Sequence, residues 1–280
     1  MPYAKTLYQS IQRFNNNARL QVLVVDAVEG MLDESEYLSY YSLDQLIDTQ
    51  FFSEIKQKYF RKHRIDRFRW SIKPVFVNYL FQLDFDKVII VDSDVHFFND
   101  FEFLFDDLNE YNIILSPHWR TLDPSFDEGD FSRNYTNGLY NGGFVGFNKK
   151  SQNAVLWWAK VCSYKCEINP KKGFYDDQGY LTLLPLIEEK VKIIHHRGCN
   201  VASWNNIENK RNEIDDEVFI NGKYPIIFIH FSNKIFERAA KGIDTTLKKY
   251  IIDYSKSLAS NGAMLNKYQK QLIKDYDKDN

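Results

Sequence analysis

The chain has 280 residues, a formal net charge of −2, and a composition that is 44% hydrophobic and 16% aromatic. This apolar content supports a sizeable core and excludes a disordered chain. Because nucleic-acid binders normally carry a basic excess, the charge argues against a nucleic-acid partner. No apolar run approaches the roughly 20 residues that span a bilayer, and no signal peptide opens the sequence, so we expect a cytoplasmic protein.

Hydrophobic spacing predicts helices that alternate with short buried strands along most of the chain. Helices are expected over residues 3–14, 34–60 and 72–83, with Pro74 near the start of the last, and a further helix passes through Trp157 and Trp158. Strands are expected over residues 20–25, 87–91, 113–116, 144–147, 191–195 and 226–230. Residues 123–138 are polar and acidic without a clear period, which predicts a long loop.

This alternation predicts an α/β domain with a largely parallel sheet. Ligands of such sheets bind beyond the carboxyl ends of the strands, where Asp26, Asp92, Ser116 and His230 all fall. From about Asp244 the chain becomes rich in Lys and Tyr and helical in pattern, which predicts a main domain over residues 1–243 and a C-terminal helical extension over 244–280. Two interpretations of this extension stay open: contact with lipid headgroups or an acceptor, or a solvated helix face.

Paired aspartates of the form Asp-x-Asp occur four times, as Asp84/Asp86, Asp92/Asp94, Asp275/Asp277 and Asp277/Asp279. Only Asp92 directly follows a predicted buried strand, and only Asp94 precedes an apolar and aromatic segment, Val95 to Phe98. Two carboxylates on one turn can converge on a hard divalent cation, since Mg²⁺ and Mn²⁺ prefer oxygen ligands. The alternative is a strand-end turn with two solvated side chains.

Two classes of enzyme place such a pair after a strand: metal-dependent nucleotide-sugar transferases and haloacid-dehalogenase-like phosphatases. The phosphatase pair usually lies near the start of its domain and requires a later Lys and a later acidic pair, which Asp176-Asp177 could imitate. Here the pair lies a third of the way along the chain and no convincing Ser/Thr and Lys set follows. The sequence therefore favours the transferase.

Several segments resemble known glycosyltransferases. Trp70-Ser71-Ile72-Lys73-Pro74 and the strand that ends at Asp92-Ser93-Asp94 resemble the Lys-Pro helix and metal motif of glycogenin-like (family 8-like) enzymes of the GT-A fold. Downstream segments resemble bacterial nucleotide-diphospho-sugar transferases: Ser116-Pro117-His118, Tyr140-Asn141-Gly142-Gly143-Phe144, Trp157-Trp158, Asp177-Gln178, Cys199-Asn200-Val201-Ala202-Ser203-Trp204-Asn205 and His230-Phe231-Ser232. These segments occur in the family's order over roughly residues 1–235.

The resemblance implies a GT-A (Rossmann-like) domain with a mixed, largely parallel sheet flanked by helices. It also implies that Asp92, Asp94 and His230 hold a divalent metal, Mn²⁺ or Mg²⁺. A mixed carboxylate and imidazole set suits Mn²⁺ better. The alternative for His230 is a histidine whose nitrogens are satisfied within the core.

The same resemblance implies roles for residues that meet the donor. Asp177 and Gln178 are the implied catalytic residues, which would orient hydroxyls or stabilise a developing oxocarbenium ion. The implied substrate-binding residues are Lys73, Asn141, Gly142, Gly143, Asn200 and Trp204. Lys73 would pair with phosphate, while the glycines would let the backbone approach the sugar closely.

The implied function is transfer of a sugar, with retention by analogy, from a nucleotide-diphospho-sugar donor to a glycan or glycolipid acceptor in bacterial surface polysaccharide synthesis. Peripheral contact with the inner face of the membrane stays open. Two features depart from the family: the chain opens on the Pro2-Tyr3-Ala4-Lys5 helix, so the first strand is expected to be absent, and Phe236 replaces a Lys. These departures keep a non-catalytic nucleotide-sugar or glycan-binding protein as an alternative.

Overall fold

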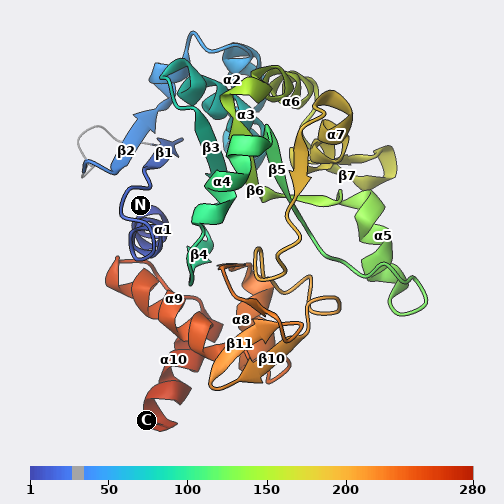
Figure 1. The fold of residues 1–280 in the computed structure, drawn as a ribbon. Coiled ribbons are helices and arrows are strands. Elements are labelled where there is room, and N and C mark those ends of the chain that lie inside the picture. Colours follow the sequence, from blue (N-terminus) through green and yellow to red (C-terminus); the bar gives the residue numbers. More distant parts are fainter. Residues whose placement is uncertain (27–34, 280) are drawn as a thin grey trace. The chain divides into compact units, whose positions relative to one another are not determined.

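The computed structural model describes residues 1–26 and 35–279, and the chain divides into two units that alternate along the sequence (Figure 1). Unit 1 comprises Met1–Ala18, Asp92–Phe101 and His195–Asn280, whereas unit 2 comprises Arg19–Val91 and Glu102–Ile194. The chain leaves unit 2 after Val91, so Asp92 is the first residue of a short inserted segment of unit 1.

Unit 2 contains the longest helix and the largest sheet of the described chain. Its strands are β1 (Leu20–Val24), β2 (Leu38–Ser42), β3 (Lys87–Val91), β5 (Ile113–Pro117), β6 (Tyr140–Asn148), β7 (Ile168–Asn169), β8 (Phe174–Tyr175) and β9 (Val191–Ile193). Its α-helices are α2 (Phe52–Tyr59), α3 (Ile65–Gln82), α4 (Glu102–Glu110), α5 (Glu128–Thr136), α6 (Gln152–Tyr164) and α7 (Leu184–Ile187). A 3₁₀ helix, Gln178–Leu183, leads into α7.

The main sheet of unit 2 has the strand order β3-β6-β5-β9. Strand β6 is antiparallel to both β3 and β5, and only β5 and β9 form a parallel pair in this sheet. The expectation of a largely parallel sheet is therefore wrong, although the mixed α/β class is confirmed. Because β6 runs in reverse, its first residues lie beside the last residues of its neighbours: Phe144 pairs with Val91, and Tyr140 with Pro117.

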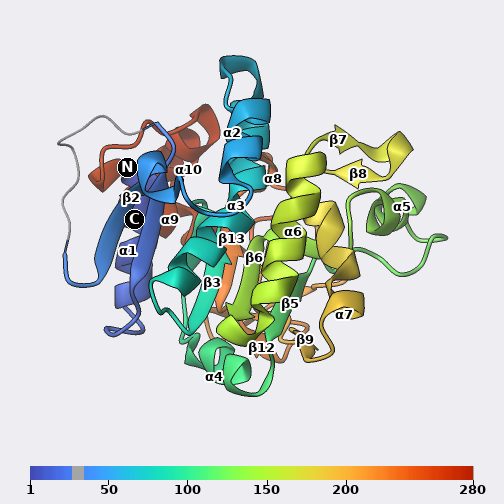
Figure 2. The ribbon, with the colours of Figure 1, turned by 90° about the horizontal axis from the view of Figure 1, so that it is seen from above.

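One face of this sheet carries the core of unit 2. The register aligns Phe147 with Val88 and with Ile113, so alternate side chains of three strands share that face. Helices α3 and α6 cover it and lie side by side, as Figure 2 shows. The fully buried Trp158 of α6 stacks on Phe147 with 5.7 Å between ring centroids. These aromatic contacts position the strand ends that carry the polar residues described below.

Three expected elements of unit 2 were wrong in part. Residues 38–42 form β2, which pairs in parallel with β1, because period-2 burial prevails there over the helical pattern; residue 34 lies outside the described residues. Helix α3 begins at Ile65, which leaves Pro74 in its interior, because Phe68 and Val75 extend the buried face. Within the expected loop, α5 forms with Asp127 as its N-cap, whose carboxylate accepts from the backbone N–H of Asp130 at 2.8 Å.

Unit 1 joins the first helix to a short central segment and to the last third of the chain. Its elements are α1 (Pro2–Gln12), β4 (Val95–Phe97), β10 (Arg211–Ile214), β11 (Glu217–Ile220), β12 (Tyr224–Pro225), β13 (Phe228–His230), α8 (Asn233–Ala240), α9 (Lys248–Ser260) and α10 (Lys267–Asp279). Strands β4 and β13 pair antiparallel. The ring of Tyr254, from α9, stacks on Phe231 with 4.0 Å between centroids, which ties the C-terminal helices to the end of β13.

The C-terminal helices belong to unit 1 on both sides of the boundary that was expected after Ile243. That boundary stays a prediction. Helix α1 contacts α9, where the side-chain amide of Asn261 donates to the Thr6 hydroxyl at 3.0 Å. Across residues 1–26 and 35–279, none of the helices combines the length and the apolarity that crossing a membrane requires. All three cysteines are buried free thiols.

His96 makes the stability of unit 1 sensitive to acid. Its ring packs against Phe98 and Tyr254, and burial, helped by the positive charge of Arg13, lowers the pKa of His96 to about 4. In the unfolded state the His96 imidazole is protonated as the pH falls through about 6.5, whereas in the folded state it is protonated only near pH 4. Stability is therefore full above pH 6.5 and falls as the pH drops through this window.

We expect the free energy of unfolding to decrease by about 2 kcal/mol between pH 7.5 and pH 5 through His96 alone. His96→Phe should remove this part of the pH dependence, and urea unfolding of both proteins at the two pH values measures it. Equal losses in the wild type and the variant would contradict the assignment to His96.

Candidate functional site

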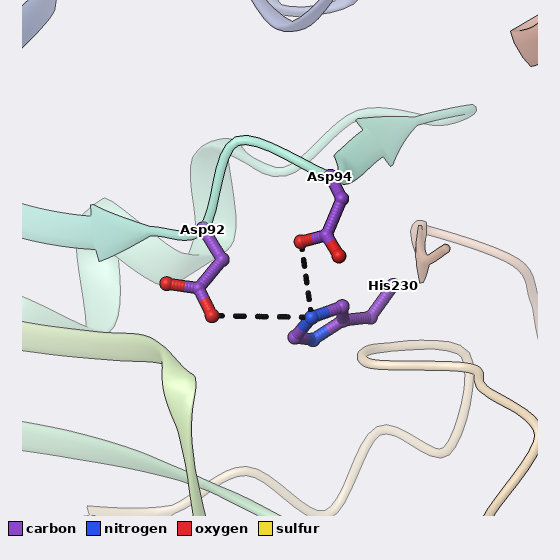
Figure 3. A group of neighbouring side chains, drawn as sticks. All are labelled: Asp92, Asp94 and His230. Carbon is purple, nitrogen blue, oxygen red and sulfur yellow. Dashed lines mark ion pairs between the residues drawn. The ribbon is translucent and has the colours of Figure 1, made fainter. Parts of the chain in front are cut away.

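The two aspartates that were expected to bind a metal lie on a tight turn between β3 and β4. The backbone N–H of Val95 donates to the carbonyl oxygen of Asp92 at 3.0 Å, which closes the turn. Because the turn is this short, the carboxylates of Asp92 and Asp94 lie on the same side of it (Figure 3). Their side chains keep 34% and 37% of their surface exposed, so both remain open to solvent or a ligand.

The third residue, His230, is brought to the turn by strand pairing. It lies opposite Val95 in the β13–β4 pair, and the next residue, Phe231, donates its backbone N–H to the carbonyl oxygen of Asp94 at 2.8 Å. On its other side, the backbone N–H of His230 donates to the carbonyl oxygen of Val201 at 2.9 Å. These backbone bonds fix the imidazole, whose side chain is only 9% exposed.

The three side chains converge on one point. The Nε2 atom of His230 lies 3.1 Å from Oδ1 of Asp94 and 3.9 Å from Oδ2 of Asp92, and one ligand atom from each residue lies within 4.8 Å of the others (Figure 3). Neighbouring ligands of an octahedral Mg²⁺ or Mn²⁺ stand about 3 Å apart and opposite ones about 4.2 Å. The donor set and its spacing therefore fit such an ion, and about three positions would remain for other oxygens.

A different cation could occupy the same point. Two carboxylates that face one imidazole nitrogen favour a positively charged or hydrogen-bond-donating group between them. That group is either the N–H of His230, if Nε2 carries the proton and donates to Asp94, or a divalent metal. The geometry of the three residues accommodates both, and the Mn²⁺ affinity of the protein distinguishes them.

Trp204 and Asn200 lie in unit 1, in the loop that precedes β10. The indole of Trp204 meets the ring of His230 edge to face, with 5.1 Å between centroids. The loop is held by Asn205, whose amide donates to the carbonyl oxygen of Asn200 at 2.7 Å and accepts from the backbone N–H of Ala202 at 3.1 Å. Asn200 is fully buried with φ of +59°, a strained backbone position that Asn tolerates better than most residues. Trp204 therefore packs directly on His230, and Asn200 directly precedes Val201, which bonds to the backbone of His230. The substrate roles expected for Trp204 and Asn200 stay predictions.

Lys73, Gly142 and Asp177 meet in unit 2. The ammonium of Lys73 donates to the carbonyl oxygen of Gly142 at 2.9 Å and lies 3.7 Å from Oδ2 of Asp177. The Asp177 side chain is only 2% exposed, and the indole N–H of Trp158 donates to its backbone carbonyl at 3.0 Å. Because a buried carboxylate is stabilised by a nearby cation, the ammonium of Lys73 acts here as the counter-charge of Asp177. The phosphate role expected for Lys73 stays a prediction.

Gln178 joins this group through the start of β6. Its side-chain oxygen accepts from the backbone N–H of Gly142 at 3.2 Å, and its side-chain nitrogen donates to the carbonyl oxygen of Asn137 at 2.8 Å. A Cβ atom on Gly142 would lie 3.1 Å from Cβ of Gln178 and 3.2 Å from Oδ2 of Asp177, so the absence of a side chain permits the close approach. The reversed direction of β6 is what brings this glycine to the carboxyl end of β3.

Asn141 and Gly143 complete the predicted set, and His118 joins them without having been assigned a role from the sequence. The amide of Asn141 lies 3.3 Å from Nε2 of His118 and also accepts from the backbone N–H of Gly143 at 2.9 Å. His118 directly follows β5, and such a position at a strand end was the signal that could have revealed it. Asp26, which was expected at the same kind of edge, instead lies 3.8 Å from Arg69.

Comparison with solved structures identifies the fold. The bifunctional glycosyltransferase WbbM aligns with 98% of this chain at a TM-score of 0.52 and 15% sequence identity. The chain shares its fold with this glycosyltransferase. Mouse xyloside xylosyltransferase 1 gives a TM-score of 0.49 at 12% identity over 84% of this chain and 93% of its own. GlyE of Streptococcus pneumoniae gives 0.49 at 14% identity over 99% of this chain.

The chain spans 49% of the length of WbbM and 60% of that of GlyE. No known protein family matches its sequence, and no curated protein matches it. The likeness therefore establishes the fold, while the reaction has to be argued from the residues.

Proposed function

We propose that the chain is a metal-dependent glycosyltransferase of the GT-A type, which moves a sugar from a nucleotide-diphospho-sugar to a glycan or glycolipid acceptor. The observation that carries the proposal is the convergence of Asp92, Asp94 and His230 in a chain with a glycosyltransferase fold. The fold likeness lends no support to a haloacid-dehalogenase-like phosphatase. In its most specific form, the proposal is that the transfer retains the anomeric configuration and takes place in bacterial surface polysaccharide synthesis.

The three residues of unit 1 would hold Mn²⁺ or Mg²⁺. A divalent ion bound there would supply Lewis-acid stabilisation of the negative charge that develops on the leaving nucleoside diphosphate. The imidazole of His230 favours Mn²⁺, because Mg²⁺ prefers oxygen ligands. The partly exposed carboxylates of Asp92 and Asp94 leave room for diphosphate oxygens. Trp204 would keep the His230 ring in place.

Considered by itself, the cluster of unit 2 carries groups that suit a sugar. Gln178 and Asn141 carry amide groups that suit sugar hydroxyls, and the backbone of Gly142 and Gly143 permits close approach. Asp177 is buried and ion-paired, so it would act on the substrate as a fixed negative charge rather than as a mobile base. A charge held in this way can stabilise a developing oxocarbenium ion without reorganisation.

Hydrolysis and transfer assays with a set of UDP-, GDP- and dTDP-sugars test the proposal. We expect release of the nucleoside diphosphate with Mn²⁺ and its loss with EDTA, and the cognate diphosphate with Mn²⁺ should raise the Tm because it binds the folded state. Absence of turnover with every donor, alongside such a rise in Tm, would contradict the enzyme and favour a non-catalytic nucleotide-sugar-binding protein.

A further inference from the structure

His118 connects two strand ends of unit 2. Its Nδ1 atom lies 3.0 Å from the carbonyl oxygen of Gly138, and its Nε2 atom lies 3.3 Å from Nδ2 of Asn141. The ring is buried, with 3% of the residue exposed, and Asn141 is 5% exposed. A buried polar contact of this kind is costly to leave unsatisfied, so its donors and acceptors must match.

The partners determine where the imidazole proton lies. A carbonyl oxygen only accepts, so Nδ1 of His118 must carry the proton and donate it to Gly138. Nε2 faces the amide nitrogen of Asn141, which donates, so Nε2 is an unprotonated nitrogen that accepts a hydrogen bond. The two contacts together specify the Nδ1–H tautomer of His118.

The orientation of the Asn141 amide follows from its contact with Gly143. The backbone N–H of Gly143 only donates, so the atom that it contacts at 2.9 Å must be the oxygen of the Asn141 amide. The nitrogen of the same amide therefore faces Nε2 of His118. If the amide were flipped, its oxygen would face the lone pair of His118 Nε2, and its N–H groups would face the backbone N–H of Gly143.

We propose that His118 is a positioning residue that holds Asn141 in this single orientation. The amide nitrogen has two hydrogens, and His118 accepts one of them. In the described part of the chain no further side-chain bond of Asn141 is found, so its second N–H is left to donate to a ligand oxygen. The proposal rests on the proposed function in that this oxygen would be a hydroxyl or ring oxygen of the donor sugar. Gly142, the next residue, touches Gln178 of the same cluster.

The tautomer can be measured without any assay of activity. In protein labelled with ¹⁵N-histidine, a long-range ¹H–¹⁵N spectrum shows which ring nitrogen carries the proton, and loss of its signals in His118→Gln assigns His118. We expect a protonated Nδ1 and a bare Nε2, with the Nε2 signal displaced in Asn141→Ala. A protonated Nε2, averaging between tautomers, or no response to Asn141→Ala would overturn the proposal.

The kinetics of donor hydrolysis test whether His118 affects activity through the orientation of Asn141. His118→Phe keeps an aromatic ring but accepts nothing from Asn141, and we expect a roughly tenfold to hundredfold loss of kcat/KM, as for an unsatisfied buried polar group. His118→Gln, which offers one donor and one acceptor, should recover much of the activity. In an Asn141→Ala background, His118→Phe should cause no additional loss, since the residues act as one.

A purely structural role for His118 would give losses that multiply in the double variant, which would overturn the proposal. His63→Phe, at an exposed position of unit 2, is the control for the substitution itself and should leave kcat/KM unchanged. If the wild type hydrolyses no donor, the proposed function fails, while the tautomer measurement still decides whether His118 orients Asn141.

Discussion

Asp94→Ala is expected to reduce metal-dependent turnover by about 10³-fold or more. Removing one of three protein ligands weakens the hold on the cation, and a Lewis acid contributes several kcal/mol to the transition state, at 1.36 kcal/mol for each factor of ten. The same substitution should weaken Mn²⁺ binding to the protein by at least about 100-fold, measured by titration calorimetry or by the EPR signal of free Mn²⁺.

Two further variants make this result specific. Asp94→Asn keeps the shape of the side chain and a hydrogen-bond acceptor for His230 but removes the charge, so it should lose Mn²⁺ binding without unfolding. Asp86→Ala alters the other Asp-x-Asp pair that flanks β3; its side chain is exposed, and we expect both turnover and Mn²⁺ binding to remain as in the wild type.

Full Mn²⁺ affinity in Asp94→Asn would show that the contact between His230 and Asp94 is a hydrogen bond inside the protein and not a metal site. Equal turnover of the wild type and Asp94→Ala in the presence of Mn²⁺ would remove the metal from the proposed reaction. The two measurements therefore separate binding of the cation from its use.

Gly198→Ala is expected to destabilise unit 1 by at least about 3 kcal/mol or to prevent its folding. A Cβ atom at this position would lie 1.8 Å from the carbonyl oxygen of Pro225 and 2.8 Å from its carbonyl carbon. Both atoms belong to the backbone, so no side-chain rotation relieves the overlap. The carbonyl oxygen of Gly198 also accepts from the backbone N–H of Ile227 at 2.9 Å, which draws the two segments together.

The consequence extends to the candidate metal centre. Ile227 directly precedes β13, which ends at His230, so a displaced segment would carry the imidazole away from Asp94. We expect a lower midpoint in urea and weaker Mn²⁺ binding in any fraction that folds. Gly129→Ala, in the first turn of α5, is the matched control: its Cβ would approach only the Asp127 side chain, at 3.4 Å, and stability should stay equal or rise slightly. A wild-type midpoint for Gly198→Ala would contradict the close backbone approach.

Local sequence patterns were sufficient for several parts of the molecule. The apolar run before Asp92 predicted β3 with its observed bounds, and the helical spacing at the start of the chain predicted α1. The turn that follows β3 was expected to bring Asp92 and Asp94 together, and it does so through a backbone bond between residues three apart. Such features depend on neighbours in the chain, whose spacing the sequence displays directly.

Other features depended on contacts between distant segments. The 144–147 pattern predicted a strand but not its direction, and the antiparallel course of β6 is what places Gly142 beside Gln178. In the same way Pro74 was expected near a helix start, yet packing of α3 against the core extends the helix over earlier residues. Periodicity reports which face of an element is buried and carries no information on what covers it.

The sequence by itself determined strand β3, the turn and the pair of carboxylates at its end, because each follows from residues that are adjacent in the chain. The strand was expected to be buried, but it lies at the edge of the sheet and only Val88 is buried. The sequence indicated His230 as a metal ligand only through the position of this residue at a strand end and through the resemblance to glycosyltransferases. The tertiary structure decided that His230 reaches Asp94, that Lys73 serves Asp177, and that His118 faces Asn141. Each of these pairs is joined by strand pairing or helix packing over a long separation, and the free energy of such contacts is gained only when the whole unit folds.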